Sequence, residues 1–374
     1  MKKEVDVLKK ESGSIDFGMF IITIILLCIG LVMVASASSY HALIYYNDSS
    51  YLFKRQLCFG VLGVLAMLII SKIDYKKYKK WSYLAFFFAA ILLLLVMTPL
   101  GVTRNGAKRW LGFGALQFQP SEIMKPVIVM ALATYMSRNV KSLKTIKGYV
   151  VPSIMVIVVV FLMYLQKHMS GMLVLIFAAV SVIFASGIKL NVRAIMAGVL
   201  IVGMIGAAFV LSEDFRLKRI LSFMNPEEDI RDGNWQAAQS IYAIGSGSLF
   251  GRGLGQSRQK YLWLPEAQND FIFSVLGEEL GLLGTSVSMG LFAFFIFKGY
   301  KIAITCKDFY GSLIASGIIS FFAVQVLINI AVVTSSMPVT GMPLPFFSYG
   351  GTSLFINLCS MGIILSISKN CERT

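Results

Sequence analysis

Charge and histidine are scarce in this chain of 374 residues. Only 14% of its residues are Asp, Glu, Lys or Arg, and it contains two histidines, whereas 57% are hydrophobic. A water-soluble globular protein needs a more strongly charged surface than this composition provides, so a soluble fold is excluded. The apolar residues fall instead in runs of about 17–25, which are long enough to cross a bilayer as helices.

Cysteine pairs at metal-binding or redox spacing are also missing. The five cysteines are scattered, with no C-x-x-C spacing and no companion histidines: Cys28, Cys58, Cys306, Cys359 and Cys371. The sequence therefore supports neither a disulfide framework nor a zinc site. A cleaved signal peptide is not expected, because the charged N-terminus leads into an apolar run without a small-residue cleavage site. We predict a retained first helix.

Acidic residues are outnumbered, with 34 Lys and Arg against 19 Asp and Glu and a net charge of +15. An excess of this size can indicate nucleic-acid binding. Most of the lysines, however, lie in short loops between apolar runs, which the positive-inside rule assigns to the cytoplasm. We interpret the charge as a topology signal and predict no nucleic-acid partner.

The apolar runs predict an all-α, polytopic membrane protein with about ten transmembrane helices and both termini in the cytoplasm. Expected spans include Phe17–Ala37, Gln56–Ser71, Tyr83–Pro99 and Ala194–Leu211, and further helices are expected to begin near Pro120, Asp270, Tyr310 and Pro345. The whole chain, residues 1–374, is expected to form a single membrane domain. One large extracellular loop, residues 212–269, is predicted between helices seven and eight.

Ionisable residues at membrane depth are costly, so each of them is a candidate functional residue. Glu122 and Lys125 are spaced i and i+3 near the outer start of helix four and therefore share one helix face. They are either an ion pair that pins neighbouring helices or groups that contact a substrate. Glu278 and Glu279, about two turns into helix eight, cannot both face one partner. At least one of them is expected to be structural or to line a hydrated cavity.

Asp270 stands at the outer boundary of helix eight, next to a basic loop. A carboxylate at a helix N-terminus is ordinarily a cap, and a catalytic role is the alternative. Glu266 is the competing carboxylate, and its simpler interpretation is a solvated loop residue. His168, in a tight turn between helices five and six, is interpreted as structural.

Two glycine-rich segments are expected at the outer surface. The glycines from Gly245 to Gly255 predict either a tight turn or close backbone approach to an anionic ligand, but neither a βαβ unit nor a GK[ST] ending accompanies them. Basic side chains that could help to hold an anion are Lys108, Arg109, Arg252, Arg258 and Lys260. The second segment, Pro338–Gly351, contains Ser348 and Gly350 and is expected to be irregular backbone.

Three stretches of the sequence carry a family resemblance. They are GAKRWLGFGALQFQPSEIMK, then QSIYAIGSGSLFGRGLGQS with the following LPEAQNDFIFSVLGEELG, and finally Asn329 followed by MPVTGMPLPFFSYGGTS. Together they are similar to the SEDS family, the FtsW/RodA/SpoVE group of bacterial cell-wall polymerases. The resemblance spans nearly the whole chain. The sequence departs from the family's usual residues at Ser248, Ser335–Ser336 and the QKHMSG turn. These departures bear on which paralogue the chain resembles and leave the family resemblance intact.

The resemblance implies a glycosyltransferase of the bacterial cytoplasmic membrane that polymerises lipid II, the undecaprenyl-pyrophosphate-linked disaccharide-pentapeptide. It also implies a class B penicillin-binding protein as partner. Asp270 matches the family's essential aspartate and is expected to act as the general base. Substrate contacts are expected from Lys108, Arg109, Glu122, Lys125, Arg252, Lys260, Glu266, Ser348 and Gly350. A divalent cation, Mg or Mn, is a candidate cofactor whose ligands the sequence does not identify.

Two alternatives from other functional classes stay open. A flippase for lipid-linked precursors would use the same spans, basic loop and intramembrane polar residues. A non-catalytic scaffold that recruits a penicillin-binding protein would need neither the clustered loop residues nor Asp270. The sequence does not separate the division, elongation and sporulation paralogues.

Overall fold

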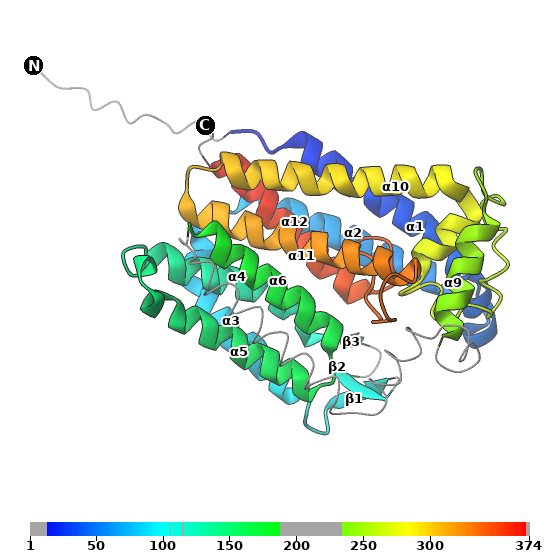
Figure 1. Cartoon of the computed structure of the whole chain (residues 1–374), viewed down its shortest axis with the longest axis horizontal. Helices are drawn as coiled ribbons and strands as arrows, with labels where there is room; N and C mark the ends of the chain where they lie inside the picture. Colours follow the sequence, from blue (N-terminus) through cyan, green and yellow to red (C-terminus); the bar gives the residue numbers. More distant parts are fainter. Residues whose placement is uncertain (1–12, 105, 114–115, 188–233, 372–374) are drawn as a thin grey trace, which may run out of the picture.

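The computed structural model describes residues 13–104, 106–113, 116–187 and 234–371. Figure 1 shows the long helices as one bundle, with helix α9 and a small sheet at the same end of it. Predicted helix seven and the first part of the predicted long loop lie outside the described residues. The chain's two ends also lie outside them.

The described helices agree with the predicted class of membrane protein. They are α1 (Phe17–Tyr46), α2 (Tyr51–Lys72), α3 (Tyr78–Leu95), α4 (Pro120–Arg138), α5 (Val150–Leu165), α6 (Met169–Ala185), α9 (Trp235–Ser246), α10 (Ile272–Thr305), α11 (Phe309–Val333) and α12 (Gly351–Asn370). Within the described ranges, seven helical segments are long and apolar enough to cross a membrane, and α6 is a shorter apolar helix. Short 3-10 turns lie in the lysine-rich connections at Tyr75–Lys77, Ser142–Lys144 and Ile146–Tyr149.

Helix α4 begins at Pro120, where the sequence predicts it. Proline suits the first helical position because the N–H it lacks would have no partner there. Buried residues surround this helix on all sides, and it packs against α3, α6 and α11. A helix buried all round belongs to the core, so α4 holds Glu122 and Lys125 in the protein interior.

The outer segment before α4 folds as a sheet, which the sequence did not predict. Three antiparallel strands, β1 (Gly101–Arg104), β2 (Ala107–Phe113) and β3 (Leu116–Phe118), pair in the order β1-β2-β3. β1 and β3 have only four and three residues, and β2 (AKRWLGF) does not alternate strictly between apolar and polar side chains, so neither signal identifies a strand from sequence. Because β3 ends just before Pro120, the sheet is anchored at the outer end of α4.

The described part of the long loop, residues 234–269, contains helix α9, which the sequence also did not predict. Helix α10 begins at Ile272 with Phe271 at the N-cap position, so Asp270 lies just outside the helix. Helix α12 begins at Gly351, later than the expected start near Pro345, because the preceding residues form the irregular segment predicted there.

The opposite end of the bundle holds the start of α1 and the end of α12. The backbone N–H of Asp16 donates to Ser368 Oγ over 3.0 Å. Cys306 and Cys371 form a disulfide, which corrects the expectation drawn from cysteine spacing. These two residues follow the ends of α10 and α12, so helix packing rather than sequence spacing brings them together.

Candidate functional site

A cavity of about 490 Å³ lies at the end of the bundle that carries the sheet. Its lining comes from α2, the sheet, the start of α4, the α5–α6 connection, the segment before α10, α11, the α11–α12 loop and the start of α12. Seven of the ten predicted site residues line it: Arg109, Glu122, Lys125, Glu266, Asp270, Ser348 and Gly350. The fold therefore gathers residues that lie more than 200 positions apart in sequence around one space.

Glu122 and Lys125 form a buried ion pair at one side of the cavity. Lys125 Nζ lies 2.6 Å from Glu122 Oε1, and both side chains are almost fully buried. Ser353 Oγ donates to the second carboxylate oxygen of Glu122 over 2.8 Å. Pairing and hydrogen bonding offset the cost of burying two charges. The pair thus joins α4 to the start of α12 while it lines the cavity.

Asp270 is a partly exposed residue whose backbone is held beside the α11–α12 loop. The side-chain amide of Asn329 donates to Asp270 O and to Met342 O, each over 2.8 Å. Gly341 has φ +70°, and a Cβ at that position would lie 3.2 Å from Asp270 Oδ2. The α11–α12 loop therefore packs closely against the Asp270 side chain on one side.

Glu266 is bound within its own turn rather than freely solvated. It adopts a left-handed backbone with φ +56°. Its carboxylate accepts a hydrogen bond from Asn269 Nδ2, and its carbonyl accepts one from Asn269 N over 2.9 Å. The turn places Glu266 and Asp270 on the same cavity.

Arg109 and His168 lie on the cavity where the sheet meets the α5–α6 turn. Arg109 Nη2 donates to the carbonyl of Lys167, and Gln119 Nε2 lies 3.3 Å from His168 Nε2. Burial lowers the pKa of His168 well below its usual value, and the positive charges of Arg109 and Lys125 lower it further. The imidazole is therefore neutral near pH 7. The sequence interpretation of His168 as structural did not place it on the cavity.

Ser348 and Gly350 belong to the α11–α12 loop and are secured by bonds within the protein. Ser348 Oγ accepts from Leu344 N over 2.7 Å. Gln56 on α2 donates to the carbonyl of Ser348 over 3.1 Å and accepts from Gly350 N over 3.0 Å. These contacts position the loop that forms part of the cavity wall.

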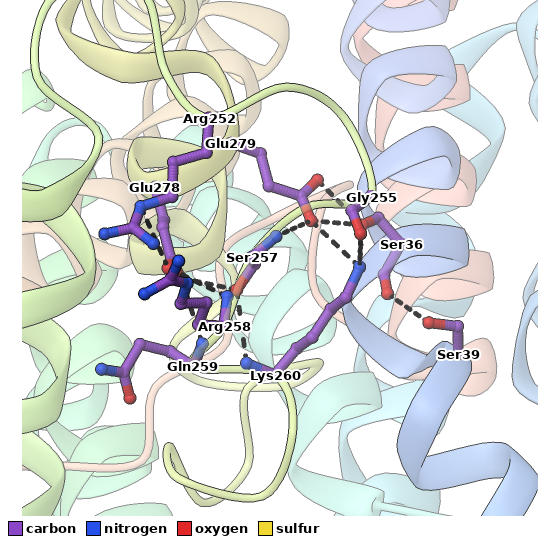
Figure 2. A network of polar contacts seen from close by, with 10 residues as sticks. All are labelled: Ser36, Ser39, Arg252, Gly255, Ser257, Arg258, Gln259, Lys260, Glu278 and Glu279. Carbon is purple, nitrogen blue, oxygen red and sulfur yellow. Dashed lines mark hydrogen bonds and ion pairs between the residues drawn. The ribbon is translucent and has the colours of Figure 1, made fainter.

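Lys108, Arg252 and Lys260 do not line the cavity, and their predicted substrate contacts stay predictions. Lys108 Nζ lies 3.5 Å from Met97 O. Figure 2 shows the other two beside a pair of buried glutamates. Lys260 Nζ lies 3.3 Å from Glu279 Oε1, and Arg252 Nε lies 3.8 Å from Glu278 Oε1.

Several residues that line the cavity were not singled out from the sequence: Arg55, Trp110, Gln119, Asn269 and Gln325. Gln325 gives a detectable signal, because it is an amide side chain in the middle of the apolar helix α11. Its side chain is buried, and its Oε1 has no hydrogen-bond partner among the described residues. A ligand donor could satisfy this oxygen.

Known proteins match this chain over nearly its whole length. The FtsW/RodA/SpoVE family, described as cell cycle protein, matches residues 17–373. Stage V sporulation protein E of Bacillus subtilis (strain 168) is 42% identical over 361 residues, 96% of this chain and 98% of that protein. A probable peptidoglycan glycosyltransferase FtsW of Trichlorobacter lovleyi is 37% identical, over 96% of this chain and 94% of its own.

Solved structures match over a similar extent. A chain of a peptidoglycan synthase complex that coordinates polymerization and crosslinking superposes with a TM-score of 0.79 and is 26% identical. The match covers 96% of this chain and 99% of that one. The rod shape determining protein RodA of Thermus thermophilus gives a TM-score of 0.70 at 27% identity, over 96% and 98% of the two chains.

Proposed function

The chain belongs to the FtsW/RodA/SpoVE family, and from that premise we propose that it is a peptidoglycan glycosyltransferase that polymerises lipid II into glycan strands. It is a multi-pass protein of the bacterial cytoplasmic membrane. The observation that carries the proposal is the cavity that brings Asp270 together with Glu266, Arg109 and the Glu122–Lys125 pair. The lysine-rich connections lie at the other end of the bundle, so the cavity faces the outer side of the membrane.

The proposed reaction joins two lipid-linked disaccharides. The 4-hydroxyl of the acceptor sugar attacks the anomeric carbon of the donor and expels undecaprenyl pyrophosphate. A hydroxyl is a poor nucleophile at neutral pH, so a base must accept its proton as the bond forms, a contribution of about 10²–10⁴-fold. We assign this role to Asp270, a partly exposed residue that lines the cavity. Direct displacement converts an α-linked donor into a β-linked product with inversion.

The leaving group needs positive charge rather than a proton. Pyrophosphate departs readily when cationic groups match the charge that develops on its oxygens. Arg109 and Arg55 line the cavity and are assigned this role. A single carboxylate base then suffices, unlike in a glycosidase, where a second carboxyl group must assist the sugar leaving group or act from the other face.

A divalent cation, Mg or Mn, is proposed as a cofactor held by Glu266, which leaves Asp270 free of metal to act as the base. Mg²⁺ is commonly bound by one or two carboxylates together with substrate phosphates, which fits one carboxylate donor on this cavity. Among the described residues, no group of three or more His, Cys, Asp or Glu could hold a metal. The proposed cation would therefore need oxygen ligands from the substrate, and when bound it would add positive charge beside the pyrophosphate.

A class B penicillin-binding protein is the proposed partner. The solved peptidoglycan synthase complex couples polymerization with crosslinking, and its matching chain superposes on nearly all of this protein. New glycan formed at the outer end of the bundle would be accessible to a crosslinking enzyme on the same side. Co-purification with such a protein, followed by a crosslinking assay, tests this part of the proposal.

Purified protein in liposomes with fluorescent lipid II tests the reaction. We expect glycan chains on a gel, and we expect Asp270→Asn to abolish chain growth while lipid II binding persists. Asp48→Asn is the matched control, because Asp48 is an exposed carboxylate in the α1–α2 turn and does not line the cavity. Normal chains from Asp270→Asn would refute the base. Lipid II reorientation without chain growth in the wild type would indicate a flippase. If the wild type showed neither activity, the scaffold role would be favoured.

A further inference from the structure

Helix α10 is broken at Gly281, and the glycine-rich loop of residues 247–255 fills the break. Gly281 has φ +66° and ψ −163°, so the helical hydrogen bonds are interrupted there. Four backbone bonds connect the loop to the break: Arg252 N to Glu278 O (3.0 Å), Gly253 N to Glu279 O (3.0 Å), Leu282 N to Ser248 O (2.9 Å) and Leu283 N to Leu249 O (3.1 Å). The loop thus satisfies groups that the break exposes.

Only glycine permits this contact at three positions. A Cβ at Gly281 would lie 2.4 Å from Gly251 N, and one at Gly251 would lie 2.1 Å from Glu279 O. A Cβ at Gly247 would lie 2.0 Å from Gly277 O. These distances are far below van der Waals contact, so the loop and α10 meet backbone to backbone.

The side chains of Glu278 and Glu279 hold the following part of the loop, as Figure 2 shows. Glu278 accepts hydrogen bonds from Ser257 Oγ (2.6 Å), Arg258 N (2.9 Å) and Gln259 N (3.2 Å). Glu279 accepts from Ser257 N (3.2 Å), Lys260 Nζ (3.3 Å) and Ser36 Oγ (2.6 Å). Ser36 lies on α1. Both glutamates accept from Ser257, which corrects the expectation that only one of them could face a given partner. Together they fix the loop against two transmembrane helices.

The loop carries exposed apolar side chains beside the lipid-facing row of α10. Phe250 is 78% exposed and Leu249 is 58% exposed. The backbone of Leu249 is bonded to that of Leu283, which lies on the face of α10 that also carries the exposed Val287, Phe294 and Phe297. The apolar surface of the loop is thus continuous with a surface that faces lipid.

The length of α10 sets the depth of this surface. The helix has 34 residues, about 51 Å at 1.5 Å per residue, which exceeds a hydrocarbon core of about 30 Å. If Lys298 marks the inner boundary, about 20 residues of helix place the outer boundary near Glu278 to Gly281. Leu249 and Phe250 then lie at the outer edge of the hydrocarbon.

We propose that residues 247–255 form a loop inserted into the outer leaflet, with Leu249 and Phe250 in contact with lipid acyl chains. Irregular backbone tolerates membrane depth only where protein satisfies its polar groups, and the bonds across the α10 break do so. The exposed Arg258 lies next to this loop and can reach headgroup phosphates. This role is independent of the proposed polymerisation.

Site-directed spin labelling in liposomes tests the insertion. The five cysteines are replaced in a full-length background that keeps the wild-type melting temperature, and nitroxides are attached to Phe250→Cys, Val287→Cys or Lys54→Cys. Val287 is 60% exposed on lipid-facing α10, and the Lys54 side chain is 66% exposed at the outer end of α2. We expect the label at 250 to resemble that at 287, with higher accessibility to oxygen than to a water-soluble nickel chelate.

Two further variants test the cause of the insertion. Gly281→Ala, which crowds the loop, should shift the label at 250 toward nickel accessibility. Gly290→Ala on the same helix should leave it unchanged, because a Cβ there meets nothing within 4 Å. A label at 250 that resembles the one at 54 would overturn the proposal. A label shielded from both reagents would also overturn it, since protein from a second copy or a partner would then cover the loop.

Discussion

The side-chain amide of Asn329 donates one hydrogen bond to the backbone oxygen of Asp270 and another to that of Met342. Asn329 is buried near the outer end of α11, and the two carbonyls belong to separate segments that meet at the cavity. Both amide hydrogens are therefore used to hold the proposed base against the α11–α12 loop. No other side chain type of this length supplies two donors and one acceptor without charge.

Asn329→Asp should lower polymerisation by about tenfold or more. The variant places a carboxylate against two carbonyl oxygens, and leaving a buried acceptor unsatisfied costs about 1–3 kcal/mol. The measurement is the initial rate of glycan formation from fluorescent lipid II. Asn370→Asp at the other end of the bundle is the control, because the Asn370 amide donates to Ser366 within α12, far from the cavity. Equal rates for Asn329→Asp and the wild type would mean that Asp270 needs no such support.

Gly341→Ala should also slow turnover by about tenfold, since small displacements of a reacting group are costly. Its left-handed backbone strains any Cβ, and the added atom would lie 3.2 Å from Asp270 Oδ2. Gly106→Ala separates backbone strain from crowding of Asp270. Gly106 has φ +73°, so an alanine there is strained, but a Cβ there meets nothing within 4 Å. If both variants lose activity equally, backbone strain rather than crowding of Asp270 explains the loss.

The sequence predicts the bundle well because long apolar runs and charged loops are strong local signals. Pro120 begins α4 as expected, and the irregular backbone between Pro338 and Gly350 follows from its prolines and glycines. The sheet and α9 were missed. The sheet is made of hairpins between successive short strands that follow one another in residues 101–118, and α9 is a single 12-residue helix that packs against α10. Neither is long enough to give the signal of a transmembrane run.

The candidate site was predicted in part for the same reason. Glu122, Lys125 and Asp270 stand out because charge is rare in apolar surroundings. The basic residues of the long loop were harder to assign. Lys260 is neutralised by Glu279, a partner 19 residues away that the fold of the loop brings within 3.3 Å. Sequence alone cannot separate a cation paired within the protein from one that faces a ligand.

The Glu122–Lys125 pair allows its structural and substrate roles to be separated. Lys125→Met should destabilise the protein by about 3–5 kcal/mol, because it leaves a buried carboxylate without its partner. Glu122→Leu combined with Lys125→Met should recover much of that stability, since a well-packed apolar pair replaces a buried ion pair at little cost. Thermal unfolding in detergent and polymerisation are measured on each variant.

The double variant decides between the two roles of the pair. Stability without polymerisation would indicate that the charges contact substrate, whereas recovery of both would leave a purely structural pair. Lys54→Met is the control, because its ion pair with Asp48 is exposed and should be worth about 0–1 kcal/mol.

His168 should make the protein less stable as the pH falls below about 6.5, the usual pKa of an unfolded histidine. Burial and the charges of Arg109 and Lys125 depress its folded pKa, so the unfolded chain binds the proton first. Stability from this group is complete above pH 6.5 and declines toward the folded pKa, by about 1.4 kcal/mol for each pH unit.

Melting temperatures of His168→Gln should therefore fall less between pH 7.5 and 5.5 than those of the wild type. A His168→Gln slope identical to that of the wild type would assign the acid sensitivity to the carboxylates, and the neutral imidazole beside Arg109 would then have no measurable effect on stability.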